Sequence, residues 1–166
     1  ALTVLGLAAF PAGRYATYTA LADRIRQSFS NPDATLRELF TRIAFNMLVG
    51  NTDDHGKNHA AFVHPDGITL TLTPAYDICP QARAGGEAAL AMAYGPHGER
   101  TAQVDPLIDA ASVYHQAPAD ATGIVERLET TIRSEWDDVC DLAHLTSSQL
   151  RAFWGTQFLN PFTLGR

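Results

Sequence analysis

The sequence predicts a single mostly α-helical domain with a small β-hairpin, an α+β fold, and three observations lead to this prediction. Long segments on both sides of the middle carry apolar residues at helical spacing. Two short strand-like runs, AAFVH and GITLTLT, flank the turn signal PDG. The chain has 166 residues, of which 46% are hydrophobic and 18% charged, so it is typical of one globular domain with a buried core.

Two helices are expected in the first fifty residues. The segment 18–29 has apolar residues four apart, which predicts an amphipathic helix. Asn31 can cap a second helix, and Pro32 suits its first position. The broad apolar stripe over 36–49 predicts that this second helix is largely buried, and Gly50 is expected to end it.

The rest of the chain is expected to contain a hairpin, an irregular stretch and further helices. The hairpin strands are predicted at 60–64 and 67–73. The proline-bracketed and glycine-rich region 74–100 is expected to be irregular, with a short extended piece at 88–94. Three helices are then predicted: 104–115, 119–142 and 147–158. Thr146 is the expected N-cap of the last one.

Composition narrows the classes of function. The net charge of −6 argues against nucleic-acid binding by this chain alone, since phosphate binding needs clustered Lys and Arg. No apolar run reaches the roughly 20 residues of a membrane span. Cys79 and Cys140 are far apart and match no metal-site spacing, which favours a reduced, cytoplasmic setting, although a disulfide between them stays open.

One polar stretch carries most of the candidate chemistry: GNTDDHGKNHAAF, residues 50–62. Asn58 follows Asp53 by five positions, and a hairpin that returns the chain could bring Asp77 to face both. Phosphoryl-transfer enzymes of the protein-kinase type use this arrangement. One carboxylate deprotonates the attacking hydroxyl, while the other carboxylate and an amide oxygen hold Mg²⁺. Lys57 could offset phosphate charge.

Other interpretations of the same stretch remain open. A lone D-x-x-x-x-N pattern occurs by chance, and two adjacent acids usually mark a solvated turn. His55 and His59 have a zinc-like spacing, but Gly56 weakens a helix there and no third ligand is evident. A metal-dependent phosphatase or nuclease built on Asp53, Asp54 and these histidines is the corresponding enzyme hypothesis. We expect His55 instead to be a structural hydrogen-bonder that braces the loop.

Two linked motifs make the context more specific. LFTRIAFNMLVGNTDDHGKNHAAF, followed by LTPAYDICP, resembles the C-terminal kinase core of the HipA family. Proteins of this family are the toxins of bacterial type II toxin–antitoxin systems and have a serine/threonine protein-kinase fold. The family pattern is an apolar helix, a G-N/A-T-D-x-H-x-K-N loop, a hairpin and L-T/S-P-x-Y-D. The resemblance covers about 15–145, and we expect 1–166 to form one HipA-like C-terminal kinase lobe.

The resemblance implies a role for each matching residue. Asp53 would be the catalytic base. Asn58 and Asp77 would be the Mg²⁺ ligands. Through this ion they would also bind ATP, the co-substrate. His55 would hold the loop in shape, and Lys57 would lie near the phosphates.

The resemblance also implies an activity and partners. The activity is transfer of the ATP γ-phosphate to a Ser/Thr hydroxyl of a protein substrate. The implied partner is a HipB-like DNA-binding antitoxin. The implied location is cytoplasmic, without membrane contact. Tyr76 is expected to pack or to position its neighbour, and Asp54, at a variable position, receives no role.

The pattern of an N-terminal lobe has no match in the chain. Family kinases carry a phosphate loop and a strand lysine there, whereas Lys57 is the sole lysine of this chain. We therefore expect a C-terminal lobe from a longer protein, given its start at Ala1, and poor phosphate transfer by the lobe alone. The alternative function is a non-catalytic module that binds an antitoxin or another partner.

Overall fold

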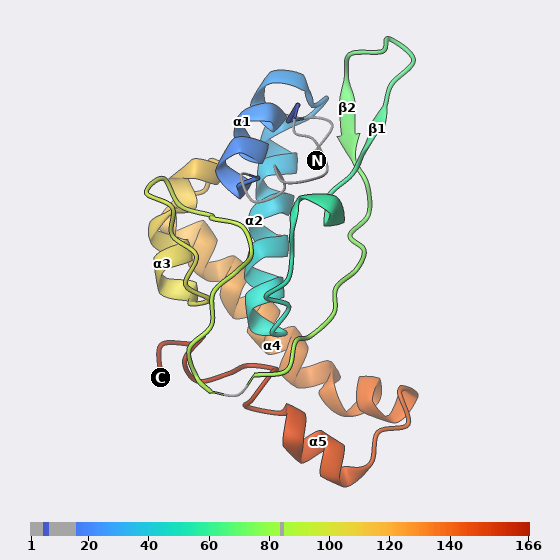
Figure 1. The fold of residues 1–166 in the computed structure, drawn as a ribbon, viewed down its shortest axis with the longest axis vertical. Coiled ribbons are helices and arrows are strands. Elements are labelled where there is room, and N and C mark those ends of the chain that lie inside the picture. The colour runs from blue at the N-terminus through green and yellow to red at the C-terminus, as the bar shows by residue number, and fades with distance from the viewer. Residues whose placement is uncertain (1–4, 7–15, 84) are drawn as a thin grey trace.

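The computed structural model describes residues 5–6, 16–83 and 85–166, so most of the opening segment lies outside the described residues. The described chain is mostly helical and has one two-stranded antiparallel sheet (Figure 1), which confirms the predicted fold class. The elements are α1 (Tyr18–Ser28), α2 (Pro32–Leu48), the 3₁₀ turn η2 (Gly56–Asn58), β1 (Ala61–Val63), β2 (Leu70–Leu72), α3 (Val104–Asp109), the 3₁₀ turn η3 (Ala111–Tyr114), α4 (Pro118–Leu142) and α5 (Ser147–Phe153).

Helix α1 covers the predicted segment, and α2 begins and ends at the expected signals. The side chain of Thr17 accepts a hydrogen bond from a backbone N–H of the first turn of α1. Asn31 does the same for α2, with Pro32 in the first turn. Gly50 follows the end of α2 with φ +74°, a left-handed conformation that glycine adopts without steric cost. The sequence prediction for this half is confirmed.

Helix α2 is the centre of the domain and packs against α1 on one side and α4 on another (Figure 1). Seven apolar side chains on its inner face are fully buried: Leu36, Leu39, Phe40, Ile43, Ala44, Met47 and Leu48. Burying one large apolar side chain contributes about 1.5–3 kcal/mol, so this face alone accounts for much of the hydrophobic stabilisation. The polar loop that follows therefore begins from a fixed position.

The hairpin forms, but its strands are shorter than predicted. β1 and β2 pair in antiparallel register, with Phe62 opposite Thr71. The carboxylate of Asp66 accepts hydrogen bonds from the backbone N–H groups of Ile68 and Thr69. These donors are held by the turn, so regular pairing on the returning strand begins only after Thr69.

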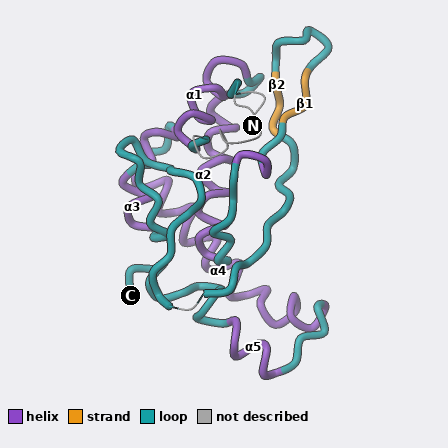
Figure 2. Tube along the Cα trace, viewed as in Figure 1, coloured by secondary structure: helices purple, strands orange, loops and turns teal. Residues whose placement is uncertain are grey.

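The C-terminal half differs from the prediction in three places. The expected helix 104–115 is divided into α3 and η3 at Ala110, where the last turn tightens. α5 ends earlier than expected because Trp154 is extended and Gly155 has φ +72°. The extended piece at 88–94 contributes a single bridge, from Ala89 to Thr101, and the long loop between β2 and α3 is otherwise irregular (Figure 2). Among the described helices, none combines the length and the apolar character needed to cross a membrane.

Candidate active site

Two chain segments lie side by side beyond α2: the loop 50–60 and the segment 73–81 that leaves β2. Three hydrogen bonds join them: Thr73 N to Ala60 O (3.0 Å), the Tyr76 hydroxyl to Lys57 O (2.6 Å), and Gln81 N to Gly50 O (2.9 Å). The two segments therefore run in opposite directions and are tied at both ends and in between. The hairpin returns the chain to the loop, as the sequence predicted, and brings the segment with Asp77 against the loop with Asp53 and Asn58.

The candidate residues differ in burial. Asp53, Lys57 and Asp77 are exposed, whereas Asn58 is 7% exposed and closes η2. Asp77 has φ +58°, a left-handed conformation that Asp tolerates better than most residues. Within the described ranges, no hydrogen bond engages the side-chain oxygens of Asp53, Asn58 or Asp77. These oxygens are therefore available to a ligand.

The donor set of Asn58 and Asp77 fits Mg²⁺. The ion takes hard oxygen ligands and is usually held by one or two protein groups, with waters and phosphates completing its shell. The buried side-chain amide of Asn58, which has no hydrogen-bond partner among the described residues, and an exposed carboxylate on the facing segment provide such a pair. For the residues that the structure describes, no cluster of three or more His, Cys, Asp or Glu side chains could hold a metal. The transition-metal phosphatase or nuclease hypothesis gains no support from this geometry.

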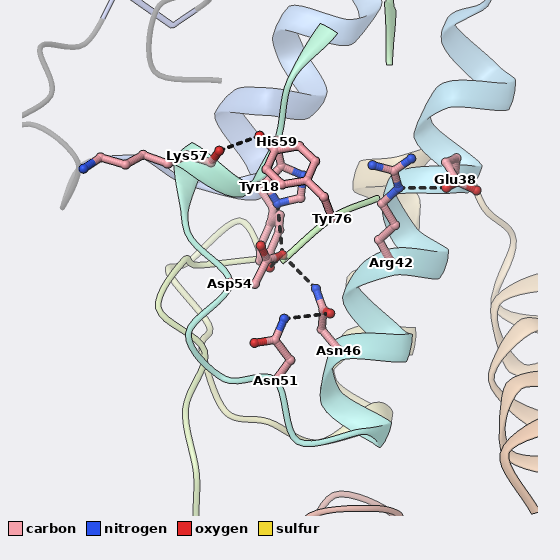
Figure 3. A network of polar contacts seen from close by, with 9 residues as sticks. All are labelled: Tyr18, Glu38, Arg42, Asn46, Asn51, Asp54, Lys57, His59 and Tyr76. Atoms are coloured by element: carbon pink, nitrogen blue, oxygen red, sulfur yellow. Dashed lines mark hydrogen bonds and ion pairs between the residues drawn. The ribbon is translucent and has the colours of Figure 1, made fainter. Parts of the chain in front are cut away.

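A buried polar network lies directly behind the loop, with Asp54 at its centre (Figure 3). Asp54 is 2% exposed, and its Oδ2 accepts a hydrogen bond from the Tyr18 hydroxyl at 2.5 Å and from Asn46 Nδ2 at 2.8 Å. The Nε2 of His59 lies 3.0 Å from the same oxygen, a contact in which the imidazole donates. The carboxylate is thus bonded to α1, to α2 and to the residue that follows η2.

The network extends to the start of the loop and keeps the Tyr18 hydroxyl protonated. Asn51 Nδ2 donates to Asn46 Oδ1 at 3.1 Å. The Tyr18 ring meets the His59 ring edge to face, with centroids 5.7 Å apart. Burial, followed by the adjacent Asp54 carboxylate, raises the pKa of Tyr18 well above its ordinary value. The phenol therefore stays neutral and remains a hydrogen-bond donor.

Two sequence expectations need correction here. Asp54 was expected to be a bystander, but it is the buried acceptor that three side chains share. His55 was expected to brace the loop, but its Nδ1 is buried with no hydrogen-bond partner in the described part of the chain. His59 is the histidine that makes the bracing contact. A usable signal was Asn46, a polar residue within the apolar stripe of α2, because a buried amide needs a partner.

Further contacts anchor the two segments to the core. Arg42 donates from Nη2 to the backbone oxygen of Thr73 at 2.7 Å and pairs with Glu38 one turn earlier (Figure 3). A Cβ at Gly50 would lie 2.6 Å from the backbone oxygen of Gln157, so the C-terminal segment packs tightly on the start of the loop. Both segments therefore rest on fixed backbone.

An apolar cavity of about 570 Å³ lies elsewhere, between α4, α5 and the C-terminal end of α2. Trp136, Phe45 and Phe158 contribute to its walls, together with Cys140. None of the predicted site residues lines it, so it does not belong to the candidate active site. Cys140 and Cys79 are both free thiols.

The same region is matched by comparison with known proteins. The model of the HipA-like C-terminal domain family matches residues 1–136, which include both motifs of the candidate site and all of α1 and α2. The chain belongs to this family. The match ends within α4, so α5 and the C-terminal segment lie beyond it.

Two curated relatives resemble shorter parts of this HipA-like domain. The serine/threonine-protein kinase toxin HipA of Shewanella oneidensis is 42% identical over 48 residues, which are 29% of this chain and 11% of that protein. A protein of Haemophilus influenzae that is provisionally named a kinase is 38% identical over 64 residues, 39% of this chain and 18% of that protein. The matched segments therefore span less than a fifth of either relative.

Proposed function

We propose that this HipA-like domain is the C-terminal catalytic lobe of a serine/threonine protein kinase that transfers the γ-phosphate of ATP to a protein hydroxyl. One observation carries the proposal. The loop with Asp53 and Asn58 is bonded along its length to the segment with Asp77, while the side-chain oxygens of all three lack protein partners in the described chain. The kinase names of the two relatives support the same activity.

Each residue then has a chemical role. Asp53, exposed at the front of the loop, would orient the substrate hydroxyl and accept its proton as the oxygen attacks phosphorus. Asn58 and Asp77 would hold Mg²⁺, which when bound neutralises charge on the nucleotide phosphates. The exposed ammonium of Lys57 would add positive charge beside the transferred group. The buried network behind the loop keeps these groups in one arrangement.

The proposal includes a cytoplasmic setting and a HipB-like antitoxin as partner. It also includes weak activity of these residues alone. The sole lysine of the chain, Lys57, lies in the loop, so a second lysine for the nucleotide phosphates would have to come from another lobe. The expected rate of phosphate transfer to the chain itself, with Mg-ATP, is far below that of a complete kinase.

Metal binding to the chain itself tests the proposal. Mn²⁺ is a paramagnetic substitute for Mg²⁺ and broadens the NMR signals of nearby amides. We expect broadening centred on Asn58 and Asp77, and we expect Asn58→Ala or Asp77→Ala to abolish it. Asp138→Asn, which alters an exposed carboxylate on α4, is the matched control and should leave the broadening unchanged. Broadening that avoids both residues would contradict the kinase proposal and favour a non-catalytic interaction module.

A further inference from the structure

We propose that Asp54 is a positioning residue for the magnesium site: its buried carboxylate holds the loop so that Asn58 and Asp53 present their oxygens outward. This inference rests on the proposed function. It concerns a residue to which neither the loop motif nor the relatives assign a role.

The two adjacent acids differ sharply in exposure. Asp53 is exposed and Asp54 is 2% exposed. Consecutive side chains diverge in this loop, so hydrogen bonds that pull Asp54 into the core also turn Asp53 toward solvent. The outward direction of the proposed base is thus a consequence of what its neighbour binds.

The side chains that anchor the Asp54 carboxylate come from packed helices. The Tyr18 side chain comes from α1 and is fully buried, and Asn46 comes from the inner face of α2 and is 4% exposed. Both donate to Oδ2 of Asp54. The loop is therefore referenced to two packed helices, and these are the elements least able to shift.

Asp54 and His59 close the loop around Asn58. Asp54 precedes this residue and His59 follows it, and the two side chains bond to each other at 3.0 Å. Within the closed span, the backbone N–H of Asn58 donates to the carbonyl oxygen of His55 at 2.9 Å. A loop closed at its neck and pinned inside has few alternative conformations, so the amide oxygen is held ready for an ion.

A purely structural role for the network must be separated from positioning. The chain offers a matched pair of buried tyrosines for this purpose. Tyr18 donates to Asp54 at 2.5 Å, while Tyr114 donates to the backbone oxygen of Tyr94 at 2.7 Å, and both rings are fully buried. Tyr18→Phe and Tyr114→Phe each delete one buried hydroxyl from the same core, but only the first touches the loop.

The test compares the Mn²⁺ dissociation constants of Tyr18→Phe, Asp54→Asn and Tyr114→Phe with that of the unaltered chain. The constants are measured by electron paramagnetic resonance, well below the unfolding temperature of each protein. We expect Tyr18→Phe and Asp54→Asn to weaken binding roughly tenfold or more, as loss of an outer-shell partner does elsewhere. Tyr114→Phe should lower the unfolding temperature and leave the constant within about twofold.

Two other results would overturn the inference in distinguishable ways. Equal constants for Tyr18→Phe and Tyr114→Phe, with Asn58→Ala still abolishing binding, would leave the metal site standing and remove the positioning role. Failure of the unaltered chain to bind Mn²⁺, or binding that survives Asn58→Ala, would instead remove the proposed site and this inference with it.

Discussion

The hydroxyl of Tyr76 lies 2.6 Å from the backbone carbonyl oxygen of Lys57, and each of these residues immediately precedes a proposed magnesium ligand. Lys57 comes before Asn58, and Tyr76 comes before Asp77. This hydrogen bond therefore ties the two facing segments together immediately beside both ligands. The side chain of Tyr76 is 43% exposed, so this bond contributes more to geometry than to the core.

Removal of this bond gives the first prediction. Tyr76→Phe should change the free energy of unfolding by less than about 1.5 kcal/mol, because a partly exposed hydrogen bond contributes little net stability. It should still weaken Mn²⁺ binding, since the segment with Asp77 loses the middle one of its three hydrogen bonds to the loop. Isothermal titration and urea unfolding measure the two effects. Thr71→Val, which deletes an exposed hydroxyl within the hairpin, is the control and should leave Mn²⁺ binding unchanged.

Gly50 gives the second prediction, because it has a built-in control. Gly50 and Gly67 have nearly the same φ, +74° and +71°, but only at Gly50 would a Cβ meet backbone, the Gln157 oxygen at 2.6 Å. Gly67→Ala should cost about 1–2 kcal/mol from the left-handed conformation alone. Gly50→Ala should cost clearly more, and the difference in urea unfolding measures the tight contact with the C-terminal segment. Equal costs would show that the contact relaxes freely.

Local sequence signals were sufficient for most of the fold. Asn31 and Thr146 cap the helices that follow them, as predicted, since side-chain capping depends only on neighbouring residues. The predicted ends of two elements were wrong because a local hydrogen bond or backbone conformation interrupts the pattern of apolar residues. The carboxylate of Asp66 shortens the hairpin strand, and the last helix ends before Gly155.

The candidate site was also predicted in part: features that depend on nearby residues were predicted, and those that depend on distant residues were not. The return of the hairpin to the loop follows from chain geometry and could be foreseen. The role of Asp54 could not be read from its own neighbourhood, because its donors Tyr18 and Asn46 lie 36 and eight residues away in sequence. A buried Asn within an apolar stripe indicates that it has a hydrogen-bond partner, but it does not identify that partner.

The two adjacent acids give the third prediction. Asp53→Ala should change the free energy of unfolding by about 0.5 kcal/mol or less, since this exposed side chain makes no hydrogen bond to the described residues. Asp54→Ala should cost about 3 kcal/mol or more, because it leaves the Tyr18 hydroxyl and the Asn46 amide buried without their acceptor. Urea unfolding of both variants decides. Similar costs would place Asp54 outside the core.

The hairpin turn gives the fourth prediction, on acid titration. Hydrogen bonds from the Thr69 hydroxyl and the backbone N–H groups of Ile68 and Thr69 lower the pKa of Asp66 to about 2. Because the pKa of Asp66 is lowered, these bonds stabilise the turn at any pH above the pKa of Asp in the unfolded chain. This stabilisation is lost as the pH falls through about 2. Carbon-13 NMR of the carboxyl group should report this value. Thr69→Val should raise the pKa, and an unchanged value would contradict the assigned cause.

Buried tyrosines give the last prediction, on alkaline stability. Burial raises the pKa of Tyr18 and of Tyr114 well above the ordinary value, and raises that of Tyr94 to about 12. Below about pH 10 these groups keep their protons in both states, so they add no pH dependence. Above it the unfolded chain loses protons that the folded chain retains, so stability falls as the pH rises.

The slope of this fall identifies the groups. Tyr18 and Tyr114 each contribute up to about 1.4 kcal/mol per pH unit, so together they give up to about 3 kcal/mol per unit, and Tyr94 adds to this slope until the pH approaches about 12. Urea unfolding between about pH 9 and pH 11.5 measures the slope across the unfolded tyrosine pKa. Tyr18→Phe should reduce it by the share of one proton, as should Tyr114→Phe. A profile that stays flat through this range would mean that the Tyr18 hydroxyl is not held as a neutral donor to Asp54.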